Sequence, residues 1–314
     1  MQGQKVRSFV ISVIGSGNVG ANTAFFVAET GAADVLLCDL REGLSAGKAL
    51  DLMEAAPIRT YRTLVRGTDS VEDIAGSQAV VIAAGRVRTP GMSRLDLLED
   101  NAPLIEELAH RVAALAPEAV VILATEPVDV LTALFVRRSR LPRERVLGVG
   151  SILDATRLRY AVARDLHVSP ESVAATVIGR HDERMLCLPR YTTVSGVPVL
   201  DLMGEDRFEA LAREVAAAGD FIVDMARRSS AYYAPSAAIA ELVRTMAGGS
   251  RRVFAVSLFL EGELGVHGAA LGVPAVIGRH GVERVLVPRL TPGQQRMLRD
   301  SVGELKKLLE GRSP

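Results

Sequence analysis

Three glycines near the N-terminus have the spacing of a phosphate-binding loop. In VIGSGNVGANTA, Gly15, Gly17 and Gly20 fit the pattern G-x-G-x-x-G between an apolar run and a predicted helix. Gly15 would make the tight turn, Gly17 would let the backbone approach a pyrophosphate, and Gly20 would let the helix pack on the strand. The N-terminus of that helix would face the phosphates. We expect the loop residues to bind a dinucleotide: Gly15, Ser16, Gly17, Asn18, Val19 and Gly20.

The second predicted strand ends at Asp39. A carboxylate at this point accepts hydrogen bonds from the adenosine ribose and repels a 2′-phosphate. We therefore expect the cofactor to be NAD rather than NADP.

Two other charged segments could act on a substrate. GRVRTPGMSRLDLL carries Arg86, Arg88 and Arg94 after a predicted strand, where a guanidinium group could bind an anion or simply be solvated. VIGRHDERML carries a single histidine, His181, which is either a proton-transfer group or a polar loop residue. The residue types alone do not decide whether the arginines bind an anion, or whether His181 transfers protons.

In the first half of the chain, the sequence predicts strands that alternate with helices, and these elements would position the residues named above. Four apolar runs predict buried strands, and helices are expected between them; Ser93 and Asp96 form a capping box for the longest helix. The pattern predicts a parallel sheet covered on both faces. The strands are expected over residues 9–14, 34–39, 79–85 and 119–125, with helices over 18–30, 41–54 and from 93 onward.

The pattern changes near residue 150. Shorter, less apolar strands are expected within 172–179 and 190–200, with helices over 154–166 and 207–228. A last helix should begin after Thr291 as N-cap with Pro292 at its first position, and end before Gly311. We predict a Rossmann-type doubly wound parallel sheet in residues 1–149, followed by an α+β substrate and catalytic domain in residues 150–314.

Composition narrows the function classes. The 314 residues carry 37 basic and 37 acidic side chains, so nothing favours binding to nucleic acid or to an anionic membrane. No run of apolar residues is long enough to span a bilayer. Cys38 and Cys187 make no disulfide framework, which fits a reducing cytoplasm. We expect no metal.

Several segments together carry a family resemblance. GSGNVG, DLREGLSAGKALDLMEAAP, RTPGMSRLDLLEDN, PVDVLT, GSILDATRLR, SSAYYAP and LEGELGVHGAALGVPAVIG follow one another in the order and approximate spacing of the NAD-dependent malate and lactate dehydrogenase family. The chain resembles most closely the lactate-dehydrogenase-like malate dehydrogenases. The resemblance implies reversible hydride transfer between a 2-hydroxy acid and NAD, in a dimer or tetramer.

The resemblance also implies roles for single residues. His181 would be the general base, Asp154 its orienting carboxylate, and Arg157 the ligand of the substrate 1-carboxylate. Arg94 would polarise the carbonyl when its loop closes, and Arg88 would bind a second carboxylate, which favours a dicarboxylate such as malate. The small Ala231 also fits malate. Further cofactor contacts would come from Gly85, Asn101, Ala124 and Thr125.

The chain departs from the family pattern at two places. The family has Asn-Pro where this chain has Glu126-Pro127, and an ionised glutamate in the substrate site can only accept hydrogen bonds. Either burial keeps Glu126 protonated, or Glu126 pairs with an arginine; we expect Arg180, which replaces an acid before His181. Asp182 replaces the glycine after His181 and is expected to tolerate a left-handed backbone.

Three functions remain open from the sequence. The chain is a NAD-dependent malate dehydrogenase, a dehydrogenase of another 2-hydroxy acid, or a NAD-binding paralogue with impaired catalysis. The intact set of His181, Asp154, Arg157, Arg94 and Arg88 favours the first function.

Overall fold

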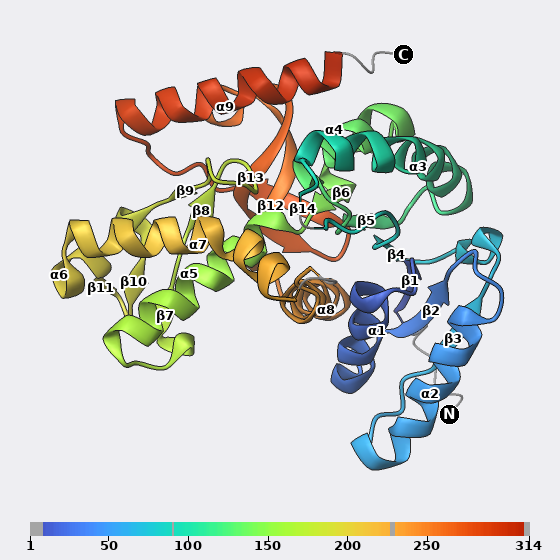
Figure 1. Ribbon diagram of the computed structural model, residues 1–314. Helices are drawn as coiled ribbons and strands as arrows, with labels where there is room; N and C mark the ends of the chain where they lie inside the picture. Colours follow the sequence, from blue (N-terminus) through green and yellow to red (C-terminus); the bar gives the residue numbers. More distant parts are fainter. Residues whose placement is uncertain (1–8, 90, 227–229, 311–314) are drawn as a thin grey trace, which may run out of the picture.

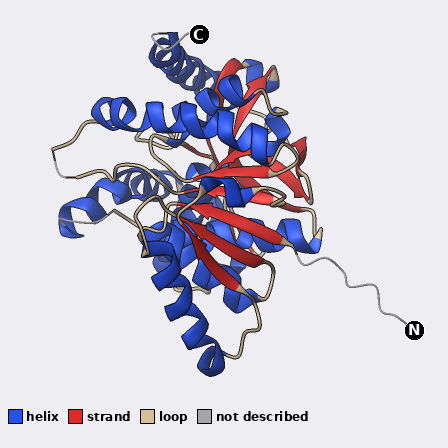
Figure 2. Ribbon diagram, turned by 90° about the vertical axis from the view of Figure 1, so that its right-hand side faces the viewer, coloured by secondary structure: helices blue, strands red, loops and turns tan. Residues whose placement is uncertain are grey.

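The computed structural model describes residues 9–89, 91–226 and 230–310. Its first half is a six-stranded parallel sheet with the strand order β3-β2-β1-β4-β5-β6. Helices pack on both faces of this sheet (Figure 1, Figure 2). The elements are β1 (Val10–Ile14), α1 (Asn18–Thr30), β2 (Asp34–Cys38), α2 (Leu44–Arg59), β3 (Val65–Thr68), β4 (Ala79–Ile82), α3 (Arg94–Leu115), β5 (Val120–Leu123), α4 (Val128–Ser139) and β6 (Val146–Gly148).

The strand order creates a crevice at the carboxyl ends of the strands. β1 pairs with β2 on one side and with β4 on the other, so the chain reverses direction along the sheet at β1. Ligands of doubly wound sheets bind at this switch point. β1, β4 and β5 are almost entirely buried, as expected for continuous apolar runs in a sheet covered on both faces.

The second half begins with α5 and adds two small sheets and a long antiparallel extension. The extension, β12-β13-β14, joins the parallel sheet where Ser257 of β12 pairs with Gly148 of β6. The elements are α5 (Gly150–Leu166), β7 (Val173–Ala174), β8 (Val177–Ile178), β9 (Leu186–Cys187), β10 (Thr193–Val194), β11 (Val197–Pro198), α6 (Val199–Met203), α7 (Glu205–Ala226), α8 (Tyr233–Gly248), β12 (Arg252–Glu261), β13 (His267–Gly278), β14 (Gly281–Val285) and α9 (Pro292–Glu310).

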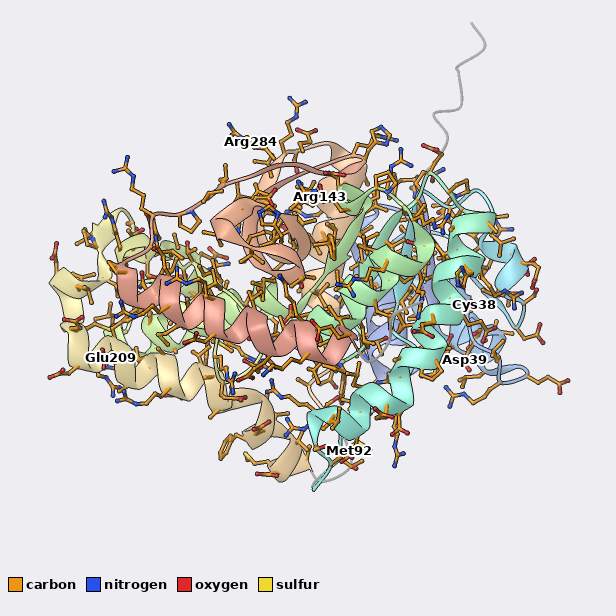
Figure 3. All side chains as sticks on the ribbon, turned by 90° about the horizontal axis from the view of Figure 1, so that it is seen from above. Cys38, Asp39, Met92, Arg143, Glu209 and Arg284 are labelled. Carbon is orange, nitrogen blue, oxygen red and sulfur yellow. The ribbon has the colours of Figure 1, made fainter. Side chains whose placement is uncertain are left out.

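The two halves contact one another through helices and through the shared sheet. α8 packs on α1, and α9 lies against β13 and α4. α7 packs beside α5. In Figure 3, Asp39 after β2 and Glu209 on α7 lie at opposite sides of the molecule.

Local signals predicted two helix starts correctly. The Ser93 hydroxyl accepts a hydrogen bond from the N–H of Asp96, whose carboxylate accepts one from the N–H of Ser93. Thr291 and Gln294 form the same reciprocal pair at the start of α9. Such pairs satisfy N–H groups that the helix itself leaves free. Gly311 lies outside the described residues.

Other boundaries differ from the predictions. α2 begins at Leu44 and continues through Pro57 to Arg59, and α5 begins at Gly150 rather than at residue 154. The predicted strand over 172–179 is two short strands, because β7 pairs with β10 while β8 pairs with β9. The sequence did not predict α4, α8 or the extension β12-β13-β14, whose pairing depends on distant parts of the chain.

Candidate active site

The loop between β8 and β9 presents His181 to the cleft. The N–H of His181 donates to Asp129 Oδ2 at 2.7 Å, and Asp129 Oδ1 accepts from the Ser257 hydroxyl at 2.6 Å. Gly150 at the start of α5 leaves room for the histidine, because an added Cβ there would lie 2.6 Å from the His181 Cβ. The backbone of His181 is therefore fixed by α4, β12 and α5.

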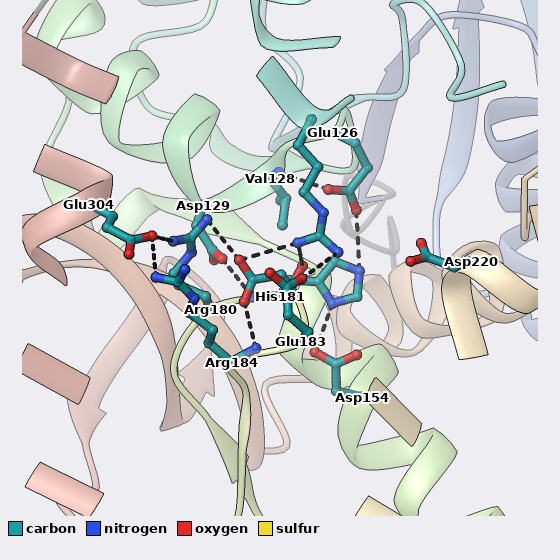
Figure 4. Close-up of polar contacts among 12 residues, drawn as sticks. Glu126, Val128, Asp129, Asp154, Arg180, His181, Glu183, Arg184, Asp220 and Glu304 are labelled. Atoms are coloured by element: carbon teal, nitrogen blue, oxygen red, sulfur yellow. Dashed lines mark hydrogen bonds and ion pairs between the residues drawn. The ribbon is translucent and has the colours of Figure 1, made fainter. Parts of the chain in front are cut away.

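The imidazole ring of His181 lies between two carboxylates. Nδ1 is 2.7 Å from Oδ2 of Asp154, which is fully buried on α5. Nε2 is 3.3 Å from Oε1 of Glu126, which follows β5. Figure 4 shows Glu126 and Asp154 on opposite sides of the ring. Burial lowers the pKa of His181, but the two carboxylates more than offset this and raise that pKa well above its usual value.

Glu126 does not behave as either sequence interpretation expected. Desolvation in the cleft raises its pKa, although 43% of the side chain is exposed; the charge of His181 and hydrogen bonds from that ring and from the N–H of Val128 lower the pKa below its ordinary value overall. Glu126 is thus ionised at neutral pH, and the prediction of a protonated carboxyl is wrong. Its ion-pair partner is His181, so the predicted Arg180–Glu126 pair is wrong as well.

Arg180 points to other acids. Its guanidinium lies 2.7 Å from Asp182 Oδ2 and 3.3 Å from Glu304 Oε2 on α9. Glu304 also pairs with Arg184. The tolerance of Asp182 for a left-handed backbone is not needed, because Asp182 has no positive φ; in this segment the positive φ belongs to Gly179, at +91°.

Three arginines predicted to bind substrate line the cleft, and each already contacts an acid. Arg94 Nη1 is 3.2 Å from Asp182 Oδ2 and donates to the backbone oxygen of His181 at 3.3 Å. Arg157 Nη1 is 3.6 Å from the second oxygen of Asp154. Arg88 pairs with Asp220 of α7. The guanidinium of Arg86, also on the cleft wall, pairs with Asp100.

The cleft extends from these side chains to the crevice of the sheet. Its lining runs from the His181 loop to Val19 at the start of α1. The lining includes His181, Glu126 and Ala231 with the three arginines, which are the residues predicted to face the substrate. Among residues 9–89, 91–226 and 230–310, no group of His, Cys, Asp and Glu side chains could hold a metal ion. The other wall carries four of the predicted cofactor contacts: Val19, Gly85, Ala124 and Thr125.

The glycine loop has the geometry that a pyrophosphate needs. Gly15 has φ +100°, and a Cβ added at Gly20 would lie 1.9 Å from the Gly15 oxygen, so the helix packs closely on the turn. A Cβ at Gly17 would meet nothing, which leaves that face open. Asn18 and Val19 begin α1. These residues fit a dinucleotide whose phosphates face the helix N-terminus.

Asp39 is held beside this loop. Its carboxylate accepts from the N–H of Ser16 at 2.9 Å and from Arg41, with both contacts to the guanidinium at 2.9 Å. The hydrogen bond from Arg41 is the main reason why the pKa of Asp39 falls to about 2. The carboxylate is therefore ionised and suited to accept hydrogen bonds from ribose hydroxyls.

Asn101 has a positioning role. Its side-chain oxygen accepts from the N–H of Arg86 at 2.7 Å, and its amide donates to the backbone oxygens of Arg86 and Glu126. With 1 % of its surface exposed, Asn101 joins the two loops that follow β4 and β5. The Thr125 hydroxyl similarly donates to the Ala84 oxygen at 2.6 Å.

Two important residues were not identified from the sequence. Asp129 lies within the segment PVDVLT, and Gly150 is the first residue of α5. The residues next to them in the sequence give no sign that either one contacts His181. Their roles depend on the fold bringing α4 and α5 against the loop that carries the histidine.

A histidine held by a buried carboxylate beside a Rossmann-type crevice is an arrangement typical of nicotinamide-dependent dehydrogenases, and the fold and cleft favour this class. Family models agree: residues 9–148 match the lactate/malate dehydrogenase NAD binding domain, and residues 151–312 match the lactate/malate dehydrogenase alpha/beta C-terminal domain. The chain belongs to the lactate/malate dehydrogenase family. It is an NAD-dependent oxidoreductase.

Relatives match nearly end to end. A malate dehydrogenase from Methanosarcina mazei is 40% identical over 297 residues, covering 95% of this chain and 97% of the relative. The malate dehydrogenase of Aeropyrum pernix superimposes with a TM-score of 0.92 at 38% identity, covering 96% and 97%. A Cryptosporidium parvum lactate dehydrogenase complexed with lactic acid and NAD has a TM-score of 0.94 at 32% identity, covering 98% and 100%. Within the described residues, no helix is long and apolar enough to cross a membrane.

Proposed function

We propose that the chain is a NAD-dependent malate dehydrogenase, which interconverts malate and oxaloacetate. The observation that carries this proposal is the His181–Asp154 pair facing Arg88, Arg94 and Arg157 in one cleft. An imidazole held by a buried carboxylate can exchange a proton with a hydroxyl or keto oxygen. Guanidinium groups bind carboxylates with two hydrogen bonds each.

Each side chain then has a role in the reaction. His181 exchanges the proton at Nε2, and Asp154 fixes its tautomer through Nδ1. Arg157 binds the 1-carboxylate of the substrate and Arg94 polarises the C2 oxygen. When bound, NAD accepts or supplies the hydride; the glycine loop, Asp39, Gly85, Ala124 and Thr125 would hold it, with Asn101 supporting their loops.

The choice of a dicarboxylate depends on Arg88 and Ala231. Structural relatives include both lactate and malate dehydrogenases, so the overall fold does not discriminate between these substrates. Arg88 on the cleft wall supplies a charge for a second carboxylate, and the small Ala231 leaves room for it. Asp220 now holds Arg88 and would have to release it.

Glu126 supports a second candidate, a dehydrogenase of another 2-hydroxy acid or a catalytically impaired paralogue. An ionised carboxylate at the reacting oxygen repels an anionic substrate and cannot donate a hydrogen bond to it. Losing one such donor costs about 10²–10³ in rate in comparable sites. We expect native turnover to be slow for this reason.

The surroundings of the enzyme are also part of the proposal. We propose that the chain forms a homodimer or homotetramer. We also propose a reducing cytoplasm as its compartment, which the two free cysteines support. The division into residues 1–149 for NAD and 150–314 for substrate is supported by the boundary between the two matched family ranges.

The test is consumption of NADH with oxaloacetate and with pyruvate, for the native chain and for Glu126→Asn. Turnover of oxaloacetate well above that of pyruvate supports the proposal, and Glu126→Asn should increase it. Turnover only with other 2-keto acids would favour the other dehydrogenase. NADH binding without turnover in either chain would favour the impaired paralogue.

A further inference from the structure

The surroundings of the His181 ring define its protonation state. A neutral imidazole has one N–H, and its other nitrogen carries a lone pair that repels a carboxylate oxygen. Both ring nitrogens here face carboxylate oxygens, Asp154 at 2.7 Å and Glu126 at 3.3 Å. Only the imidazolium form can donate to both.

We propose that Glu126 keeps His181 in the imidazolium form in the substrate-free protein, so that the cleft stands ready to reduce a 2-keto acid rather than to oxidise a 2-hydroxy acid. The proposal depends on the dehydrogenase chemistry proposed above for its consequence, but the protonation state itself can be measured without turnover.

Asp154 is the nearer carboxylate and the larger cause of the raised pKa of His181, and Glu126 adds the second charge at Nε2, the nitrogen that would exchange the proton. Asp154 also forms an ion pair with Arg157, whose guanidinium lies 3.6 Å from the same carboxylate. Asp129 contacts the backbone N–H of His181 rather than the ring.

The cations near the loop have other partners. Arg94 donates to the backbone oxygen of His181 and pairs with Asp182 and Glu183, and Arg180 pairs with Asp182 and Glu304. Among the ion pairs of the described residues, His181 is the sole partner of Glu126. The Glu126 charge therefore acts on the ring without competition from a guanidinium at contact distance.

The reaction direction follows from the proton at Nε2. Reduction of a keto acid would require a proton for the C2 oxygen, and His181 would supply it from Nε2 as the ring becomes neutral, while bound NADH would supply the hydride. The keto oxygen must replace Glu126 Oε1 at Nε2; the Glu126 side chain is 43% exposed to the cleft, so it has space to turn away. A hydroxy acid instead needs a ring that has already lost this proton.

The experiment follows the ¹⁵N resonances of the histidine rings in the full chain, without cofactor or substrate, as the pH is raised. The His181 signals are assigned by their loss in His181→Asn. In the native chain, we expect both His181 nitrogens to remain protonated at pH 8. In Glu126→Gln, which keeps the size of the side chain, the midpoint of the His181 ring titration should fall by about 1 to 3 pH units.

The matched control is Glu183→Gln. Glu183 lies on the same loop and the substitution removes the same charge, but the side chain is 70% exposed and contacts Arg94 instead of the ring. It should leave the His181 midpoint nearly unchanged. A native ring that is neutral at pH 8 would overturn the proposal even if no variant folds. An equal shift in the two variants, or no shift in Glu126→Gln, would also overturn it.

The kinetic counterpart separates this proposal from the proposed function. In Glu126→Gln, the pH above which kcat/KM for keto acid reduction declines should move down together with the ring midpoint. If the ring titrates as expected but no 2-keto acid is reduced, the protonation proposal stands and the dehydrogenase proposal fails. If a 2-keto acid is reduced normally but the ring is neutral at pH 8, the dehydrogenase proposal stands and the protonation proposal fails.

Discussion

Asp182 Oδ2 lies 3.2 Å from Nη1 of Arg94 and joins the start of α3 to the loop that carries His181. The same oxygen is 2.7 Å from Arg180, and the Asp182 side chain is 2% exposed. The two guanidinium groups compensate the charge of the buried carboxylate well. In return, the carboxylate compensates the positive charge of each guanidinium. Because the resemblance places a glycine here, Arg94 in this chain is held by a contact that the family pattern does not supply.

Asp182→Asn should destabilise the fold. The substitution keeps the shape and leaves Arg180, which is 13% exposed, with less compensation for its burial. We expect the free energy of unfolding to fall by on the order of 3 kcal/mol, measured by urea denaturation at neutral pH. Glu304→Gln removes a more exposed partner of the same Arg180 and should cost much less. Equal losses in the two variants would show that the burial of Asp182 is not the cause.

Arg88→Gln should change substrate choice. The substitution removes the cation proposed to bind a second carboxylate, so kcat/KM for oxaloacetate should fall by about 10²-fold or more, while that for pyruvate changes little. The measurement is NADH consumption with each keto acid. Asp220→Asn, which frees Arg88 from its ion pair, should lower KM for oxaloacetate. Parallel losses with both acids in Arg88→Gln would mean that Arg88 does not read the second carboxylate.

The sequence predicted those parts of the molecule that depend on neighbours along the chain. The glycine loop follows from Gly15, Gly17 and Gly20 because the turn, the strand before it and the helix after it are contiguous. The start of α3 follows from Ser93 and Asp96 for the same reason. The resemblance then identified His181 and Asp154, which the fold brings to 2.7 Å.

The sequence could not predict contacts between distant elements. Arg180 was expected to pair with Glu126, but it contacts Glu304 of α9, because the packing of α9 decides which acid is near. Asp129 reaches His181 only because α4 packs beside the β8–β9 loop. The long strands β12 and β13 likewise depend on pairing with β6 and with each other rather than on a local signal.

Asp154→Asn should impair proton transfer. Without the carboxylate at Nδ1, the imidazolium loses its nearest partner and its tautomer is less well fixed, so kcat for oxaloacetate reduction should fall by about 10²–10⁴-fold. The measurement is steady-state turnover across pH. Asp165→Asn serves as the control, because Asp165 is on the same helix but pairs with Arg207 away from the cleft. Unchanged kcat in Asp154→Asn would contradict the assigned role.

Asp129→Asn should change how stability depends on pH. Burial raises the pKa of Asp129 to about 6, against 3.8 for an ordinary aspartate, although hydrogen bonds from Ser257 and His181 act in the opposite direction. The unfolded chain therefore releases this proton near pH 4, and the folded chain releases it near pH 6. Stability from this group is complete below pH 4 and is lost as the pH rises to about 6.

The asparagine variant has no such group, so the comparison isolates Asp129. The free energy of unfolding of the native chain minus that of Asp129→Asn should decrease by about 2 kcal/mol between pH 4 and pH 6.5, which is most of the roughly 3 kcal/mol that the whole shift gives at about 1.4 kcal/mol per pKa unit. Urea denaturation at several pH values measures it. His181 is present in both chains, so its own pH dependence largely cancels in this difference. A difference that stays constant with pH would show that Asp129 is ionised in the folded protein throughout.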